Sequence, residues 1–282
     1  MIMSIVQKTV LTIAGSDSSG GAGIQADLKT MEAHRVYGMS VVTALTAQNT
    51  LGITGILPVE KSFVEKQIQA VCEDIPPDAV KIGMLPDRSV MEVVAKAIDK
   101  YSLKNVVLDP VLSSTSGTEL TRIEAREYLK KQLFCRSLLI TPNIPEAQTL
   151  LSTKEGGDKE FLIDSREAME DAAKKLSSEY GCNVLIKGGH SSFEREDVSA
   201  DLLCIRPLGN AIDTEFQVIW LEGKRFDNPN THGTGCTLSS AIASNLANGH
   251  DLKSAVSEAK KYIEKCIDAG LKLGSGRGPL LH

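Results

Sequence analysis

The fold is decided by residues 9–28, which read TVLTIAGSDSSGGAGIQADL. The run from Thr9 to Ala14 is apolar and rich in β-branched residues, which is typical of a strand buried on both faces. A polar loop with several glycines follows, and an amphipathic helix is predicted over roughly 22–35. A strand, a loop and a helix in this order form the basic unit of α/β folds with a parallel sheet.

The same alternation continues along the whole chain. Buried parallel strands are predicted at 9–14, 79–83, 105–109, 138–141 and 183–187. Helices are predicted at roughly 22–35, 62–73, 88–101, 121–132, 145–151, 165–179, 234–248 and 251–270. Two or three antiparallel strands are expected between residues 200 and 225. We therefore expect an α/β fold with a mostly parallel sheet covered by helices on both faces.

No internal repeat or linker divides the chain, so we expect a single domain over residues 1–282. The polar stretch 152–160 is the most loop-like interior segment. The glycine-rich end, 274–280, is predicted to be non-helical. Residues 36–59 carry no charge, but their glycines, threonines and Gln48 would leave polar groups unsatisfied in lipid. They are therefore predicted to form two buried strands joined by a turn, not a membrane span.

Composition restricts the function. Of the 282 residues, 42% are hydrophobic and 24% are charged, which is an ordinary globular balance. The net charge of −5 and the absence of a basic cluster argue against nucleic-acid binding. The six cysteines are scattered without a metal-binding spacing, which indicates a reduced protein with free thiols. The N-terminal residues do not resemble a signal peptide, so we expect a cytoplasmic enzyme.

Polar residues follow several of the predicted strands. They are the segment 15–17, Asp109, Asn143 and Lys187. In sheets of this kind, ligands bind beyond the carboxyl ends of the parallel strands. We therefore expect these residues to converge on one edge of the sheet and to form the active site.

The segment 231–236, Thr-His-Gly-Thr-Gly-Cys, precedes a predicted helix. Gly233 and Gly235 allow the backbone to turn tightly and to approach a ligand, and the amides at a helix start favour phosphate. The alternative is an ordinary N-cap by Thr234. Amides directed at Cys236 are expected to lower its pKa, which suits a base or nucleophile; alternatively, Cys236 is only a small buried residue. His232 is expected to contribute its backbone more than its ring.

Two other features point to phosphoryl transfer. Lys187 ends an apolar strand before two glycines, where a cation can stabilise transferring phosphates; the alternative is a surface lysine. Asn143 and Glu146 have the spacing of a capping box around Pro145. The same pair suits hydrated Mg²⁺ near ATP phosphates, and the two interpretations are compatible.

A dinucleotide-binding site is the weaker interpretation of the first glycine cluster. The glycines that begin at Gly20 follow the strand too late for a tight phosphate turn. The second strand ends in Gln48 and Asn49, so the acidic residue that would hold a ribose is missing. A polar loop before a helix with Asp27 facing inward is better suited to a substrate pocket.

Taken together, these segments resemble the hydroxymethylpyrimidine/phosphomethylpyrimidine kinases of thiamine biosynthesis, in the ribokinase-like superfamily. The resemblance rests on 12–29, 81–85, 107–111, 141–147, 187–190 and 231–239, in family order over nearly the whole chain. It implies a three-layer sandwich that uses ATP and Mg²⁺. The implied substrate-binding residues are Gly15, Asp27, Gln48, Met84 and Val111.

The resemblance also implies roles around the phosphates. Asp109, Asn143 and Glu146 would serve Mg²⁺ and the phosphates, with Asp109 and Glu146 as metal ligands, and Lys187 would reach ATP. The anion hole would consist of Gly233, Thr234 and Gly235. Cys236 stands where many relatives in the wider superfamily carry an aspartate as catalytic base. The segment 194–226 matches the family least, so adenine contacts and dimer contacts there stay unassigned.

The implied function is ATP-dependent phosphorylation of 4-amino-5-hydroxymethyl-2-methylpyrimidine and then of its monophosphate, giving the diphosphate. Gln48 would pair with the aminopyrimidine ring. The closest alternative is a pyridoxine/pyridoxal/pyridoxamine kinase, and a third possibility is a non-catalytic ligand sensor. The family also implies a homodimer, with no nucleic-acid or membrane partner.

Overall fold

The computed structural model describes residues 7–112, 123–152, 161–189, 191, 193–207 and 215–282. Within these residues, nine strands form one sheet in the order β3-β2-β1-β4-β5-β6-β7-β8-β9. Their bounds are β1 Thr9–Asp17, β2 Tyr37–Asn49, β3 Gly52–Pro58, β4 Ala79–Ile82, β5 Val106–Leu108, β6 Leu139–Ile140, β7 Asn183–Ile186, β8 Val198–Ile205 and β9 Gln217–Lys224.

The five predicted parallel strands are confirmed as β1, β4, β5, β6 and β7, and β2 also runs parallel to β1. Strands β3, β8 and β9 are antiparallel to their neighbours and lie at the two edges of the sheet. The prediction that 36–59 forms two strands is confirmed, but the prediction that both are buried is wrong. Strand β3 is exposed over most of its length, because it is an edge strand that no described helix covers.

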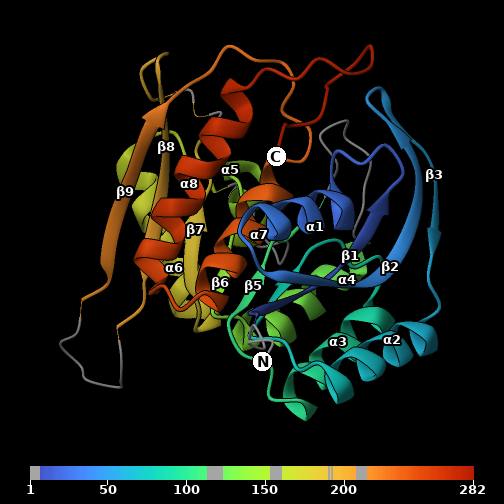
Figure 1. Cartoon of the computed structure of the whole chain (residues 1–282). Helices are drawn as coiled ribbons and strands as arrows, with labels where there is room; N and C mark the ends of the chain where they lie inside the picture. The colour runs from blue at the N-terminus through green and yellow to red at the C-terminus, as the bar shows by residue number, and fades with distance from the viewer. Residues whose placement is uncertain (1–6, 113–122, 153–160, 190, 192, 208–214) are drawn as a thin grey trace, which may run out of the picture.

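Helices cover both faces of the sheet, which gives the expected three layers (Figure 1). One face carries α1 Gly23–Ala33, α7 Thr234–Ala247 and α8 Leu252–Asp268. The other face carries α2 Lys61–Asp74, α3 Arg88–Lys100, α4 Ile123–Tyr128, α5 Ile144–Leu151 and α6 Arg166–Tyr180. The chain continues from α4 through a π-helical turn, Leu129–Leu133, and a 3₁₀ turn, Phe134–Arg136.

The helices follow from the sequence pattern. Each pairs an apolar face with a polar one, except α7, whose residues from Thr237 to Ala247 are all buried. Side-chain caps begin several of the others, such as Asp87 before α3 and Ser165 before α6. None of the helices described here has the length and apolar character needed to cross a membrane.

The sheet has a bulge close to the carboxyl end of β1. The pairing of β1 with β2 shifts register between Ala14 and Ser16, and bulges of this kind redirect side chains near active sites.

Two of the predicted loops can be compared only in part. The predicted loop at 153–160, and His190 after β7, lie outside the described residues. The glycine-rich segment 274–280 is non-helical, as expected.

Candidate active site

A cavity of about 980 Å³ runs along the carboxyl ends of the parallel strands. Every candidate residue except Asp27 lines it, although these residues come from strand ends and loops that are far apart in the sequence. The convergence expected from the strand ends is therefore present. One end of the cavity contains Gln48 and Met84, the middle contains Asp109 and Lys187, and the other end extends to Ile267.

An ion pair stands in the middle of the cavity. The Lys187 Nζ lies 2.7 Å from Asp109 Oδ1, and the hydroxyl of Thr141 donates to the same oxygen at 3.0 Å. The lysine side chain is 17% exposed, so the ion pair lies at the cavity wall and not in bulk solvent. Burial opposes its charge, but Asp109 and Glu146 raise the pKa of Lys187 above its usual value. The ammonium is therefore charged at neutral pH and available to phosphate.

Helix α7 points its open N-terminus at this ion pair. Gly233 is the N-cap residue, with φ of +86°, and no side chain caps the helix, so the alternative of an N-cap by Thr234 is wrong. Among the described residues, no protein acceptor faces the amides of Gly235 and Cys236. A Cβ added at Gly235 would lie 3.1 Å from Asp109 Oδ2 and 3.2 Å from Lys187 Nζ. Open amides and a cation therefore meet at one point, which suits an anion.

Gly233 also joins two loops. A Cβ added there would collide with the carbonyl oxygen of Gly21 in the first glycine cluster. One added at Gly21 would lie 2.5 Å from the ring of His232. The two glycine-containing loops therefore pack together through their backbones. A residue with a side chain at Gly21 or Gly233 would not fit in this contact.

Asn143 and Glu146 form the predicted capping box at the start of α5. The Glu146 amide donates to Asn143 Oδ1, and the Asn143 amide donates to Glu146 Oε2, both at 2.8 Å. Burial raises the pKa of Glu146 to about 7, with Lys187 opposing this shift and Asp109 adding to it. The cap does not exclude a role at the phosphates, because both side chains also line the cavity.

The chemistry of Asp109 and Glu146 fits Mg²⁺. The two carboxylates are close enough for Asp109 to disfavour the charge of Glu146, and a dication would relieve that repulsion. In the described part of the chain, no group of three or more His, Cys, Asp or Glu side chains could hold a metal. Two carboxylates beside a phosphate site suit Mg²⁺, which takes few protein ligands and keeps phosphate and water as the others.

Cys236 differs from the expectation. It stands in the first turn of α7 and receives a hydrogen bond from the Gly23 amide, but burial raises its pKa, and Lys81 only partly opposes this effect. The prediction of a lowered pKa is therefore wrong for the free chain, because desolvation of a thiolate outweighs the nearby amide and cation. The thiol still faces the cavity beside Gly235.

Asp27 also differs from the expectation. It does not line the cavity, because it is fully buried under the loop and ion-paired with Lys81 at 2.8 Å. The hydroxyls of Thr12 and Ser240 donate to its two oxygens, each at 2.6 Å. These contacts join α1 to β1, β4 and α7. The substrate contact expected of Asp27 stays a prediction.

One end of the cavity is built around Gly15, Gln48 and Met84. A Cβ added at Gly15 would lie 3.0 Å from the sulfur of Met84, so the glycine leaves room for the methionine to form part of the wall. Val111 lines the same cavity after β5. A small apolar wall with one side-chain amide suits a flat heterocycle with polar edge atoms.

Asp17 and His232 belong to this end. The segment 15–17 was expected at this edge of the sheet, whereas the ring of His232 was not. Asp17 accepts hydrogen bonds from the amides of Ser19, Gly21 and Ala22, and it lies 2.8 Å from His232 Nε2. Burial alone would raise the pKa of Asp17, but the bonds from His232 and Ser19 outweigh it and lower the pKa to about 2. The expectation that His232 contributes mainly backbone is wrong. An aspartate followed by serines and glycine is the sequence pattern of such a turn.

The ring of His232 also reaches the amide of Gln48, at 3.2 Å from Nε2. The contact joins this ring nitrogen to the amide nitrogen of Gln48, and the hydroxyl of Thr46 donates to the amide oxygen of Gln48 at 3.0 Å. A side-chain amide has two N–H groups and two lone pairs. Gln48 therefore keeps one N–H and one lone pair for a ligand.

The chain is similar to known proteins over nearly its whole length. The family model described as phosphomethylpyrimidine kinase matches residues 17–281. The hydroxymethylpyrimidine/phosphomethylpyrimidine kinase of Bacillus subtilis is 40% identical over 272 residues, covering 96% of this chain and 93% of that protein. The thiamine biosynthesis bifunctional protein ThiED of Geobacter sulfurreducens is 43% identical over 97% of this chain, and the chain spans about half the length of that relative, 52%.

Solved structures confirm the ribokinase-like fold expected from the resemblance. A phosphomethylpyrimidine kinase from Clostridium difficile is 41% identical with a TM-score of 0.75, covering 93% of this chain and 100% of that one. A pyridoxal kinase from Bacillus subtilis, solved with ADP, is 34% identical with a TM-score of 0.82, covering 98% and 97%. The chain therefore belongs to the phosphomethylpyrimidine kinase family.

Proposed function

We propose that this chain transfers the γ-phosphoryl group of ATP to the hydroxymethyl group of 4-amino-5-hydroxymethyl-2-methylpyrimidine, and then a second one to the resulting monophosphate. The observation that carries the proposal is the uncapped start of α7 facing the Lys187–Asp109 pair. The amides of Gly235 and Cys236 would hold phosphate oxygens, and Lys187 would stabilise their developing charge. The acceptor would lie toward Gln48 and Met84 at one end of the cavity.

The first transfer needs a proton acceptor. The hydroxymethyl oxygen bonds to the γ-phosphorus as the bond to the β,γ-bridging oxygen breaks, ADP leaves, and Cys236 in its thiolate form takes the alcohol proton. The second acceptor is a phosphate monoester, whose second pKa is about 6, so no such proton has to be removed. Mg²⁺ held by Asp109 and Glu146 would neutralise charge on the phosphates.

The unused groups of the Gln48 side-chain amide support an aminopyrimidine acceptor. Its free N–H can donate to a ring nitrogen, and its free lone pair can accept from an exocyclic amine. Pyridoxal is the second candidate acceptor, because a pyridoxal kinase is among the structures similar to this chain. In both cases the chain would work in a small-molecule pathway, with ATP as phosphoryl donor.

The test is the ratio of kcat/KM for the two acceptors at saturating ATP and Mg²⁺. We expect the hydroxymethylpyrimidine to be preferred over pyridoxal, and Gln48→Met to reduce kcat/KM for the pyrimidine by about tenfold or more. A clear preference for pyridoxal would overturn the acceptor assignment. Tight binding of the pyrimidine without turnover would indicate a ligand sensor instead.

A further inference from the structure

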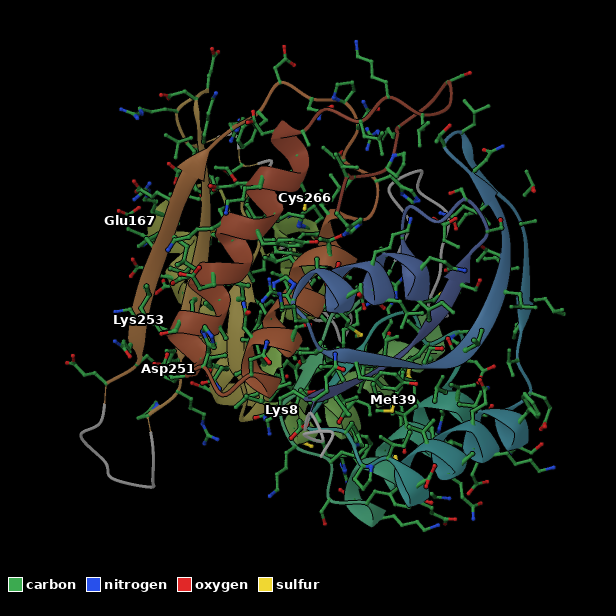
Figure 2. All side chains as sticks on the ribbon, viewed as in Figure 1. Lys8, Met39, Glu167, Asp251, Lys253 and Cys266 are labelled. Atoms are coloured by element: carbon green, nitrogen blue, oxygen red, sulfur yellow. The ribbon has the colours of Figure 1, made fainter. Side chains whose placement is uncertain are left out.

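The cavity continues well beyond the transfer centre. From Lys187 it passes Gly189 and reaches the sheet edge formed by β8 and β9, where α8 covers it. Figures 1 and 2 show α8 in front of β8 and β9, running from Asp251 at its lower end to Cys266 near its upper end. Because the acceptor site lies at the Gln48 end and the phosphates lie in the middle, the nucleoside of the donor has only this end to occupy.

The walls of this end suit a flat base. Their apolar members come from α8 and from the segment after β9, and they are Phe226, Pro229, Ile263 and Ile267. Nucleoside bases bind in slots of this kind, where a few polar groups fix their orientation. The polar groups here are therefore the ones that can select the donor.

Most charged groups at this end already have partners. Lys260 Nζ lies 2.7 Å from Asp201 Oδ2 and 3.1 Å from the Ser199 hydroxyl. The other oxygen of Asp201 accepts from the Gly188 amide at 2.8 Å. Lys260 and Asp201 therefore hold each other and are poorly placed to recognise a ligand. Arg225 donates to the Ser191 carbonyl at 3.0 Å, although its buried Nε atom has no acceptor among the described residues.

Glu264 is different. It lines the cavity one turn of α8 beyond Lys260, and its Oε1 atom is buried without a hydrogen-bond partner in the described part of the chain. Burial raises the pKa of this carboxyl, with Lys260 opposing the shift. The carboxyl packs on Gly223 of β9, where an added Cβ would collide with Oε1 and lie 2.8 Å from the carboxyl carbon. Oε1 therefore points at the sheet, while the residue itself lines the cavity. Because the described residues give this carboxylate no hydrogen-bond donor, its cavity side can accept a hydrogen bond from a ligand.

We infer that the Glu264 carboxylate accepts a hydrogen bond from the nucleoside of the phosphoryl donor, either from the exocyclic amine of adenine or from a ribose hydroxyl. Glu264 thereby selects the donor, just as Gln48 selects the acceptor at the other end. This inference rests on the proposed use of ATP, and it assigns a nucleoside contact on α8, outside the segment 194–226.

The experiment compares kcat/KM for ATP, inosine triphosphate, 2′-deoxy-ATP and 3′-deoxy-ATP in the wild type and in Glu264→Ala. Inosine triphosphate lacks the amine, and the deoxy analogues each lack one hydroxyl. We expect the wild type to prefer ATP over one of these analogues by about tenfold, the factor for a hydrogen bond to a charged group. In Glu264→Ala, kcat/KM for ATP should fall to the value of that analogue, while KM for the pyrimidine stays unchanged.

Two further variants make the result specific. Gly223→Ala keeps the carboxylate but displaces it, and its backbone conformation tolerates alanine, so it should also weaken ATP use. Glu258→Ala removes a carboxylate from the same helix that pairs with Lys261 and does not line the cavity, so it should change nothing. An unchanged kcat/KM for ATP in Glu264→Ala, or an equal loss with all four donors, would overturn the inference.

Calorimetric titration separates this inference from the proposed function. The dissociation constants of ADP, inosine diphosphate and the deoxy-ADP analogues can be measured without any acceptor. If the chain fails to phosphorylate the pyrimidine, a loss of ADP discrimination in Glu264→Ala still supports the contact. Retained discrimination contradicts it even if the enzyme is active.

Discussion

Through its two carboxylate oxygens, Asp17 connects the loop at 19–22 with His232 in the segment 231–236, at the end of the cavity that contains Gln48. Its pKa is lowered from 3.8 to about 2 in the folded chain, so folding favours the ionised form. This stabilisation, about 2 kcal/mol, is complete above pH 3.8 and is lost as the pH falls toward 2. In urea unfolding, Asp17→Asn should therefore be less stable at pH 7, and the difference from the wild type should shrink on acidification. A difference that is independent of pH would contradict this role.

Cys236 is expected to matter for one of the two transfers. In Cys236→Ala, kcat/KM for the hydroxymethyl acceptor should fall by about 10²–10⁴, whereas the monophosphate should lose less than tenfold. Because burial raises the thiol pKa, the first transfer in the wild type should also accelerate as the pH rises above neutral. Rates measured with each acceptor separately check this prediction, and equal losses in both would show that the thiol is not the base.

The conformation of the start of α7 depends on its backbone more than on any side chain. Gly233→Ala adds strain at φ of +86° and a collision with the Gly21 carbonyl, so it should cost about 2 kcal/mol or more and sharply lower kcat/KM for ATP. Gly249→Ala, at the other end of α7, is the matched control. Its φ is +91°, but nothing lies within 4 Å of the added Cβ, so only the backbone strain of about 1 kcal/mol applies. Equal effects of the two variants on stability and on ATP use would contradict the role of the loop contact.

The elements themselves were predictable where local pattern decides them. Runs such as the one from Thr9 to Ala14 are apolar on both faces, and the structure buries them as parallel strands. Helix bounds were predicted to within about three residues, because caps such as Asn143 and glycines such as Gly181 end the pattern sharply. The exposure of β3 was not predictable, because its apolar residues look the same whether or not a helix covers them.

The site was predictable only in part, because many of its contacts join residues that are far apart in the sequence. Residues at strand ends, such as Asp109 and Lys187, converge because parallel strands share one edge. The ion pair of Asp27 with Lys81 was not predictable, because the two residues lie 54 positions apart and a lone aspartate in a helix does not show whether a lysine is near it. His232 and Glu264 needed the fold for the same reason: their neighbours Asp17 and Gly223 come from distant segments.

The β2–β3 edge leads to a prediction about assembly. Leu45, Leu51, Leu57 and Phe63 are all about half exposed or more, which is unusual for side chains of this size gathered near one edge of a molecule. The homodimer predicted from the family resemblance would cover them. Light scattering should then give twice the chain mass, and Leu57→Asp should give the monomer with an unchanged circular dichroism spectrum. A monomeric wild type would contradict the prediction.

The proposed function requires two successive transfers through one centre, formed by the start of α7 and Lys187. The most direct test is to follow a limiting amount of the hydroxymethylpyrimidine with excess ATP and Mg²⁺ by phosphorus NMR until the reaction stops. We predict two ADP molecules per pyrimidine and a product with the two coupled signals of a diphosphate monoester. Lys187→Met should slow both transfers by a similar factor, because both use the same phosphates. No ADP formation from the pyrimidine, or a reaction that stops at one ADP, would contradict the account.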